Sequence, residues 1–160
     1  KTFWKIIATG FGAGYSPIAP GTMGALVGVL FLIPNLFVIA CFNGRYYLDP
    51  ILILLILSFF FIGVKATNEL ESEWGHDPQR IVIDEMVGLW ISMILIPYST
   101  MTLLVAFILF RIFDIWKPLG IRKMEKFKGG WGVMMDDVLA GVYANIVLQI
   151  LIYCFPDFFF

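Results

Sequence analysis

The sequence predicts an all-α protein: a polytopic membrane bundle of about five hydrophobic helices, preceded by a short N-terminal interfacial helix. Of its 160 residues, 60% are hydrophobic and only 14% are charged, whereas a soluble domain carries about 25% charged residues. The apolar residues gather in stretches close to the ~20 residues that a spanning helix needs. Most of the unusual charges lie within these stretches or at their ends. The length fits a single membrane-embedded domain over residues 1–160.

Each expected element has a basis in the sequence. Residues 1–20 are interrupted by glycines and prolines, which predicts a short interfacial helix and a loop rather than a cleavable signal. The stretch 22–42 contains Pro34, which is expected to kink or end its helix. The other stretches are 51–68, 82–97, 102–118 and 136–155. The third and fourth stretches are short, which leaves open whether they span fully, and their brief connection predicts an antiparallel hairpin.

The basic residues predict the orientation. They are concentrated in the N-terminal region and in loops 69–81 and 119–135: Lys1, Lys5, Arg80, Arg122, Lys123, Lys126 and Lys128. The opposite loops hold only Arg45. The positive-inside rule therefore predicts that the N-terminus and both basic loops are cytoplasmic.

Two pairs of acids are the first candidate site residues. Asp84-Glu85 is expected to begin the third long helix, and Asp136-Asp137 the fifth, both at the cytoplasmic face. Charges in lipid are costly and usually mark functional sites. Carboxylate oxygens suit Mg²⁺, so these four acids are predicted metal ligands. Asp84, Glu85 and Asp137 are also predicted to be catalytic, together with Asp114 of the fourth helix.

The second group is cationic. Arg111, Asp114 and Lys117 are spaced by three and share one helix face. Arg111 either forms a structural pair with Asp114 or makes a forked contact to phosphate oxygens. Lys117 either extends to the interface or supplies a point charge to the phosphate.

Glycines and single residues complete the sequence-based expectations. Gly21 and Thr22 begin a helix and can offer backbone N–H groups to phosphate, although Thr22 can also be a simple helix cap. Gly88 is expected to pack against a small-residue face formed by Ala140, Gly141 and Ala144.

The histidine count and the net charge bear on two classes of function. His76 is the only histidine, which excludes a phosphohistidine mechanism with a separate histidine base. The net charge of −1 gives no indication of nucleic-acid binding, and no nucleic-acid partner is expected.

Several long motifs in order resemble one known family. They are residues 8–14, 16–24, 77–88, 110–118 and 129–141. Together they resemble the phosphatidylglycerophosphatase A family of bacterial membrane lipid phosphatases, across nearly the whole chain. The resemblance implies Mg²⁺-dependent hydrolysis of phosphatidylglycerol phosphate to phosphatidylglycerol and inorganic phosphate, at the inner membrane. Residues 66–76 match poorly, so Asn68, Glu69 and His76 inherit no role.

Two other functions remain as alternatives. A membrane phosphatidyl-alcohol transferase also uses Mg²⁺ and acids, but the Asp-x2-Asp-Gly-x2-Ala-Arg run that it normally shows is absent. A small ion carrier or channel can also contain buried acids and bases. However, the charges here cluster at one predicted face, which favours the phosphatase. The sequence gives no indication of the oligomeric state.

Overall fold

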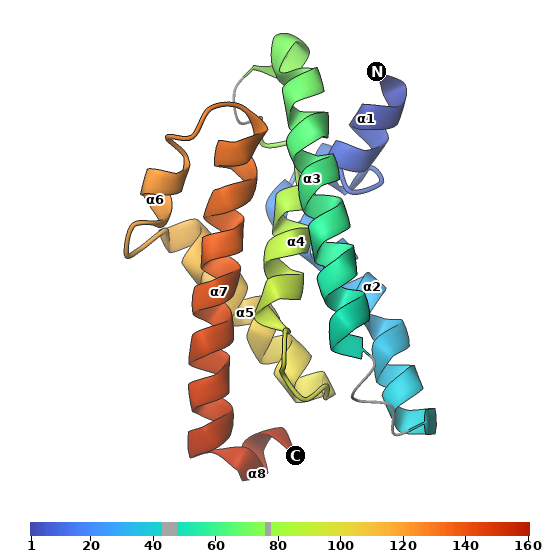
Figure 1. Ribbon diagram of the computed structural model, residues 1–160, viewed down its shortest axis with the longest axis vertical. Coiled ribbons are helices and arrows are strands. Elements are labelled where there is room, and N and C mark those ends of the chain that lie inside the picture. The colour runs from blue at the N-terminus through green and yellow to red at the C-terminus, as the bar shows by residue number, and fades with distance from the viewer. Residues whose placement is uncertain (43–47, 76–77) are drawn as a thin grey trace.

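The protein is helical throughout the part that the computed structural model describes, residues 1–42, 48–75 and 78–160, and these residues form no strand (Figure 1). Arg45 and His76 lie outside the described residues. The elements are α1 (Thr2–Ala8), η1 (Ala13–Tyr15), α2 (Pro20–Phe42), α3 (Leu48–Trp74), α4 (Ile83–Ser92), α5 (Thr100–Trp116), α6 (Ile121–Met124), α7 (Gly130–Cys154) and α8 (Pro156–Phe159). The predicted all-α class and the short N-terminal helix are confirmed.

Within the part of the chain that the structure describes, two helices, α3 and α7, are long and apolar enough to cross a membrane. Only 33% and 28% of their most apolar stretches are buried within the protein, so most of those side chains face outward. A helix at the core of a soluble protein would instead be mostly buried. This outward apolar surface fits a lipid environment and supports association with a membrane.

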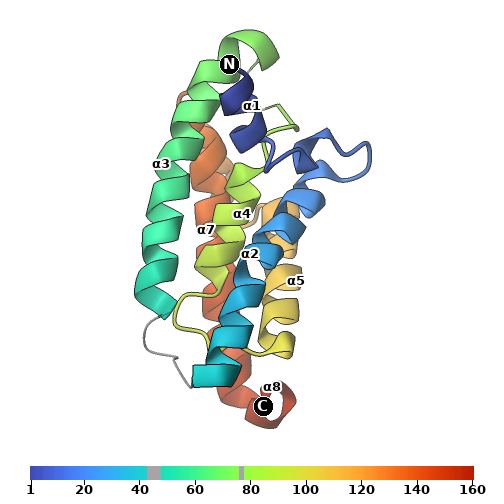
Figure 2. The same ribbon diagram turned by 90° about the vertical axis from the view of Figure 1, so that its right-hand side faces the viewer.

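The expectation of about five spanning helices is only partly supported. The helix α4 has 10 residues and α5 has 17, which correspond to about 15 Å and about 25 Å. Both lengths are below the ~30 Å hydrocarbon core of a bilayer. Instead of facing lipid, α4 lies in the middle of the bundle, with α2, α3, α5 and α7 around it (Figures 1 and 2). Nine of its ten residues are buried.

Glycines allow α4 to approach its neighbours closely. A Cβ atom at Gly88 would collide with the Phe110 ring and the Asp137 carbonyl, and one at Gly141 would collide with the Gly88 carbonyl. The predicted packing of Gly88 against the small-residue face of the last long helix is therefore confirmed. On the opposite side, Gly28 contacts Met86, and its carbonyl accepts a hydrogen bond of 2.9 Å from the Trp90 indole.

Several helix boundaries differ from the prediction, and α4 ends at Ser92 rather than at residue 97. Pro34 is expected to kink or end its helix, and α2 continues past it to Phe42, the predicted last residue of this stretch, so the helix does not end at Pro34. The helix α3 extends beyond residue 68 to Trp74, because its last turns pack on α1 and bury Leu70. The helix α7 begins at Gly130, so Asp136 and Asp137 lie in its second turn rather than at its start.

An early start for α7 has a local cause. The Asn68 side chain accepts a hydrogen bond of 2.7 Å from the Gly130 backbone N–H, which satisfies a donor that the first helical turn leaves free. A Cβ atom at Gly130 would collide with the Val64 backbone, so the glycine permits α7 to begin directly against α3.

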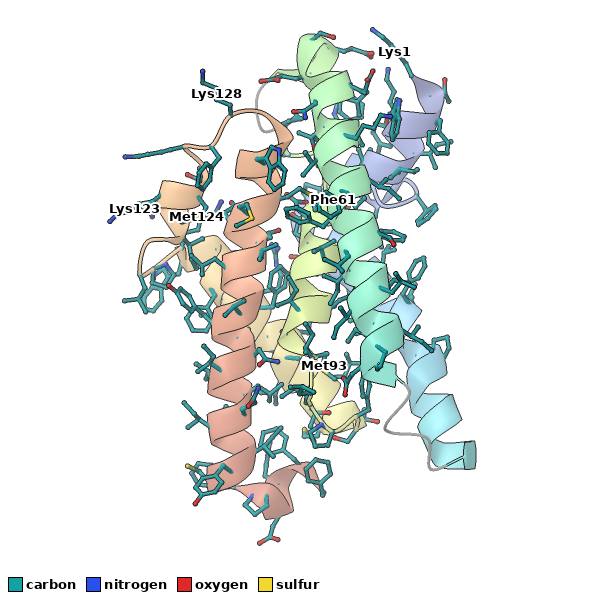
Figure 3. The ribbon with its side chains drawn as sticks, viewed as in Figure 1. Lys1, Phe61, Met93, Lys123, Met124 and Lys128 are labelled. Carbon is teal, nitrogen blue, oxygen red and sulfur yellow. The ribbon has the colours of Figure 1, made fainter. Side chains whose placement is uncertain are left out.

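Basic side chains mark one half of the bundle. Figure 3 shows Lys1, Lys123 and Lys128 projecting from the upper half, whereas Met93, which follows α4, lies in the lower half. The N-terminal region and the loop around α6 therefore share one half of the molecule, as the topology prediction requires. The structure contains no membrane, so the cytoplasmic assignment remains a prediction.

A candidate metal and phosphate site

The predicted site residues converge on one cavity of about 520 Å³. Eight of the nine line it: Gly21, Asp84, Glu85, Arg111, Asp114, Lys117, Asp136 and Asp137. They come from four separate parts of the chain, namely the start of α2, the first turn of α4, the end of α5 and the second turn of α7. The close packing of α4 on α7 at Gly88 and Gly141 brings the two acidic pairs together.

Three of the carboxylates form the centre of the cavity. Asp84, Glu85 and Asp137 each offer an oxygen, and these oxygens lie within 4.8 Å of one another. The side chains of Asp84 and Asp137 are largely buried, so they are not solvated helix caps. The Oε2 atom of Glu85 is buried and has no hydrogen-bond partner among the described residues. An unpaired buried carboxylate oxygen is costly unless a ligand satisfies it.

Asp136 takes a different position from the other three acids. Its Oδ2 atom accepts a hydrogen bond of 2.6 Å from Lys117, whose Nζ atom also donates to Glu125 at 2.6 Å. Burial opposes the charged form of Lys117, but the hydrogen bonds to Asp136 and Glu125 outweigh it and raise the pKa of the ammonium group above its ordinary value. Lys117 is therefore a fixed positive charge at the edge of the cavity.

Arg111 supplies the second positive charge. Its Nη1 atom donates to Asp114 in a half-buried ion pair, as one of the two sequence interpretations expected. The Nε atom of Arg111 is buried without a hydrogen-bond partner in the described part of the chain. Because a guanidinium has five donors, the pair with Asp114 leaves further N–H groups for an anionic ligand.

Gly21 and Thr22 line different spaces in the structure. Gly21 borders the cavity, where a Cβ atom would collide with Glu85 and crowd the Arg111 guanidinium. Thr22 instead lines an apolar groove on the adjoining side of Arg111. The backbone of Gly21 is thus close to the candidate metal and phosphate ligands, and Thr22 is one residue removed from them.

Sequence reasoning missed two residues of this region. Glu125 pairs with Lys117, and Gln79 lines both the cavity and a neighbouring one of about 630 Å³ that also contains Tyr15 and Arg80. A signal for Glu125 was available, because it is the single acid in the basic loop 119–135. Gln79 offered none, because a lone amide in a loop is unremarkable.

The glycine motif at residues 10–14 has a packing role. A Cβ atom at Gly14 would collide with the Arg80 backbone, and one at Gly10 would crowd Val82 and Met86. The Val82 N–H also donates to the Ala8 carbonyl at 2.9 Å. These contacts hold the segment before α4 in place and so position Asp84 and Glu85.

The residues present fit a divalent cation. Three carboxylate oxygens from two helices converge, and among the described residues the Oε2 atom of Glu85 has no hydrogen-bond partner. Magnesium prefers oxygen ligands and commonly binds through a few carboxylates together with substrate phosphate. The adjacent Arg111 and Lys117 provide the positive charge that a phosphate oxygen needs.

Comparison with known proteins places the chain in a family. The family model described as phosphatidylglycerophosphatase A matches residues 6–152. A protein from Bacteroides thetaiotaomicron named "Putative phosphatidylinositol-3-phosphatase" is 51% identical over 148 residues, which cover 91% of each chain. The phosphatidylglycerophosphatase A of Escherichia coli is 35% identical over 156 residues, covering 96% of this chain and 86% of the relative.

A further relative agrees with this result. The phosphatidylglycerophosphatase A of Haemophilus influenzae is 39% identical over 150 residues, covering 89% of this chain and 85% of the relative. No solved structure matches the chain. The family model covers every predicted site residue, and the match runs over most of the length of each relative. The chain therefore belongs to the phosphatidylglycerophosphatase A family.

Proposed function

We propose that this protein hydrolyses the terminal phosphate of phosphatidylglycerol phosphate, with Mg²⁺ as cofactor, at the cytoplasmic face of a bacterial inner membrane. The observation that carries the proposal is the convergence of Asp84, Glu85 and Asp137 beside Arg111 and Lys117 in one cavity. Family membership supplies the lipid phosphate as the class of substrate.

The side chains divide the work between binding and chemistry. The carboxylates Asp84, Glu85 and Asp137 hold the cation, and Asp136 orients Lys117 through their hydrogen bond. Bound there, Mg²⁺ supplies charge stabilisation to the phosphate oxygens and acidifies a water. Arg111 and Lys117 bind the nonbridging oxygens and offset the charge that develops on them.

Hydrolysis exchanges one phosphorus–oxygen bond for another. A water oxygen attacks phosphorus in line with the glycerol oxygen, the bond to that oxygen breaks, and a proton reaches the leaving alkoxide. A carboxylate of the cavity accepts the proton from the attacking water. Asp114 fixes the Arg111 guanidinium through their ion pair. The products are phosphatidylglycerol and inorganic phosphate.

A second substrate is favoured by one specific observation. The relative that is 51% identical is named for phosphatidylinositol 3-phosphate, whereas the relatives named for phosphatidylglycerol phosphate are 35% and 39% identical. Both lipids carry a phosphate monoester on a polar headgroup, so the same cation and cationic side chains suit either. The headgroups differ in size and shape, so the residues that line the cavity would determine which of the two lipids is hydrolysed.

Phosphate release from the purified protein tests the proposal. Phosphatidylglycerol phosphate and phosphatidylinositol 3-phosphate are compared in the same detergent, with Mg²⁺ and with EDTA. We expect release from phosphatidylglycerol phosphate with Mg²⁺, none with EDTA, and none from Asp84→Asn protein. A strong preference for phosphatidylinositol 3-phosphate would identify that lipid, rather than phosphatidylglycerol phosphate, as the substrate. Absence of release from both lipids would overturn the proposed function.

The assay also separates the phosphatase from the alternatives. A phosphatidyl-alcohol transferase requires a nucleotide-activated lipid, so phosphate release in its absence favours hydrolysis. Ion flux in proteoliposomes without any phosphate release would favour a carrier or channel. Family membership and the shared cavity both support the hydrolase.

A further inference from the structure

An apolar groove of about 540 Å³ adjoins the polar cavity. It lies along α5 beside the start of α2 and is lined by Thr22, Phe107, Ile108, Arg111, Ile112, Ile115 and Trp116. Most of these residues are apolar, and four of them are exposed large hydrophobic side chains on one helix: Ile108, Ile112, Ile115 and Trp116. Figure 2 shows α5 next to α2, with the two helices side by side. The groove is therefore an apolar surface at the side of the bundle.

The groove and the polar cavity are continuous. Arg111 and Ile115 line both of them. Arg111 stands at the junction, because it lines both spaces and its guanidinium pairs with Asp114 of the cavity. A ligand that extends from one to the other must pass Arg111. With a cation among the carboxylates, the cavity suits an anionic group and the groove suits an apolar one, so a ligand that fills both carries an anionic group at one end and an apolar group at the other.

We propose that this groove holds one acyl chain of the lipid substrate, which enters sideways from the bilayer along α5 while its phosphate monoester reaches the polar cavity. This inference rests on the proposed function, and it adds the part of the protein that binds the lipid tail. Ile108 and Ile112 are then determinants of lipid binding that lie outside the phosphate chemistry.

In a membrane the groove contributes alignment more than affinity. A lipid tail in the bilayer is already out of water, so moving it into an apolar groove gives little hydrophobic gain. What the groove supplies is a fixed direction of approach for the headgroup. A misplacement of about 1 Å can reduce a rate by about a hundredfold, so blocking the groove should reduce turnover of long-chain lipid.

The first test fills the groove. Ile108→Trp and Ile112→Trp are compared with Ile146→Trp, a matched control on α7 whose isoleucine is 49% exposed, against 46% for Ile108 and Ile112. The measured quantity is the ratio of kcat/KM for dioleoyl over dihexanoyl phosphatidylglycerol phosphate. We expect this ratio to fall about tenfold or more in the groove variants and to stay near wild type in the control. An unchanged ratio, or equal loss on both lipids, would overturn the proposal.

The second test does not depend on turnover. Phosphatidylglycerol phosphate with a diazirine in one acyl chain is photolysed with Asp84→Asn protein, and the labelled peptides are identified by mass spectrometry. Labelling concentrated on residues 107–116, and reduced by Ile112→Trp, would support the groove. Labelling spread evenly over α3, α5 and α7 would overturn it. If label collects in the groove but wild type releases no phosphate, the acyl site stands and the proposed hydrolysis fails.

Discussion

Three acids that approach within 4.8 Å repel one another when all are charged. Asp84 is 8% exposed and Asp137 is 3% exposed, so little water screens that repulsion. A cluster of this kind destabilises the fold unless a cation lies among the carboxylates. The protein keeps it nonetheless, which is typical of a site where activity is retained at the expense of stability.

Removal of one charge from the cluster should separate stability from activity. In Asp137→Asn we expect phosphate release to fall by at least about a hundredfold, because a ligand and a charge are lost together. Without Mg²⁺ the melting temperature should rise, since repulsion is relieved. The increase that added Mg²⁺ gives to wild type, by binding only the folded state, should disappear. Thermal unfolding with and without Mg²⁺ measures both effects.

The matched control is Asp157→Asn, on the exposed C-terminal helix α8. It removes the same charge from a residue that does not line the cavity and should behave like wild type in both assays. Turnover near the wild-type level in Asp137→Asn would contradict the assignment of this residue as a ligand.

Arg111 and Lys117, the two proposed phosphate ligands, are not interchangeable. A lysine at position 111 keeps the charge but cannot make a forked contact or retain the same pair with Asp114. The loss of one hydrogen bond to a charged group costs about 1.5–3 kcal/mol. We therefore expect kcat/KM of Arg111→Lys to fall by about 10- to 100-fold. Arg122→Lys, on the exposed face of α6, is the control, and equal kinetics in the two variants would exclude a forked contact.

At the level of the helices, the fit between α4 and α7 decides whether the site assembles. Backbone meets backbone where Gly88 and Gly141 touch, and no other residue type leaves enough space. The same contact sets the separation of Asp84 from Asp137, which lie on the two helices. A change of one methyl group there affects the packing and the site together.

We expect Gly141→Ala to destabilise the protein by about 1–3 kcal/mol, as overpacking does in a close-packed core, and to reduce phosphate release. Its control is Val142→Ala on the next, outward-facing residue, which is 37% exposed and should have little effect. Thermal unfolding in detergent and phosphate release are measured for both. If Gly141→Ala melts and turns over like wild type, the close contact does not position the site.

The sequence predicted which stretches are helical better than where the helices begin. The sequence predicts a basic loop over residues 119–135 and the last long helix over 136–155, whereas α7 begins at Gly130. The difference comes from the hydrogen bond to Asn68 and the contact with the Val64 backbone. Both partners lie more than sixty residues away in the chain, so no local pattern contains this information.

The candidate site was more predictable than the helix boundaries, because charged side chains inside apolar stretches must face either the protein interior or a water-filled cavity. Their convergence on one cavity follows from the cost of leaving them in lipid. Sequence did not reveal that Asp136 pairs with Lys117 while the other acids cluster, or that Thr22 borders the groove. Those distinctions depend on side-chain direction, which the spacing of residues along a helix does not determine.

Across the whole molecule, Lys1, Lys123 and Lys128 project from the upper half of the bundle (Figure 3). The acidic pairs of the cavity lie near the starts of α4 and α7, and both helices begin in that half (Figure 1). The positive-inside rule predicts that this half is cytoplasmic. The opposite end carries Cys154, an exposed free cysteine at the end of α7. The two ends therefore offer separate positions for chemical labelling.

The sequence contains one other cysteine, Cys41. We expect a membrane-impermeant thiol reagent to label Cys154 in spheroplasts when Cys41 is replaced by serine. In a second variant, with both cysteines replaced and Lys123→Cys added, labelling should require inverted membrane vesicles. Each variant is also labelled after detergent solubilisation, as a control for reactivity. The reverse pattern would place the cavity on the outer face and reject the proposed location of the reaction.

The interior position of α4 also has a consequence for biosynthesis. The ribosome synthesises α4 well before α7. During that interval Asp84 and Glu85 lack Asp137, the third acid of the cluster, and Gly88 lacks its contact with Gly141. A helix of ten residues is too short to span the bilayer by itself during this interval. Enzyme activity should thus appear only after the final long helix has left the translocon, and a nascent chain halted before it remains catalytically silent.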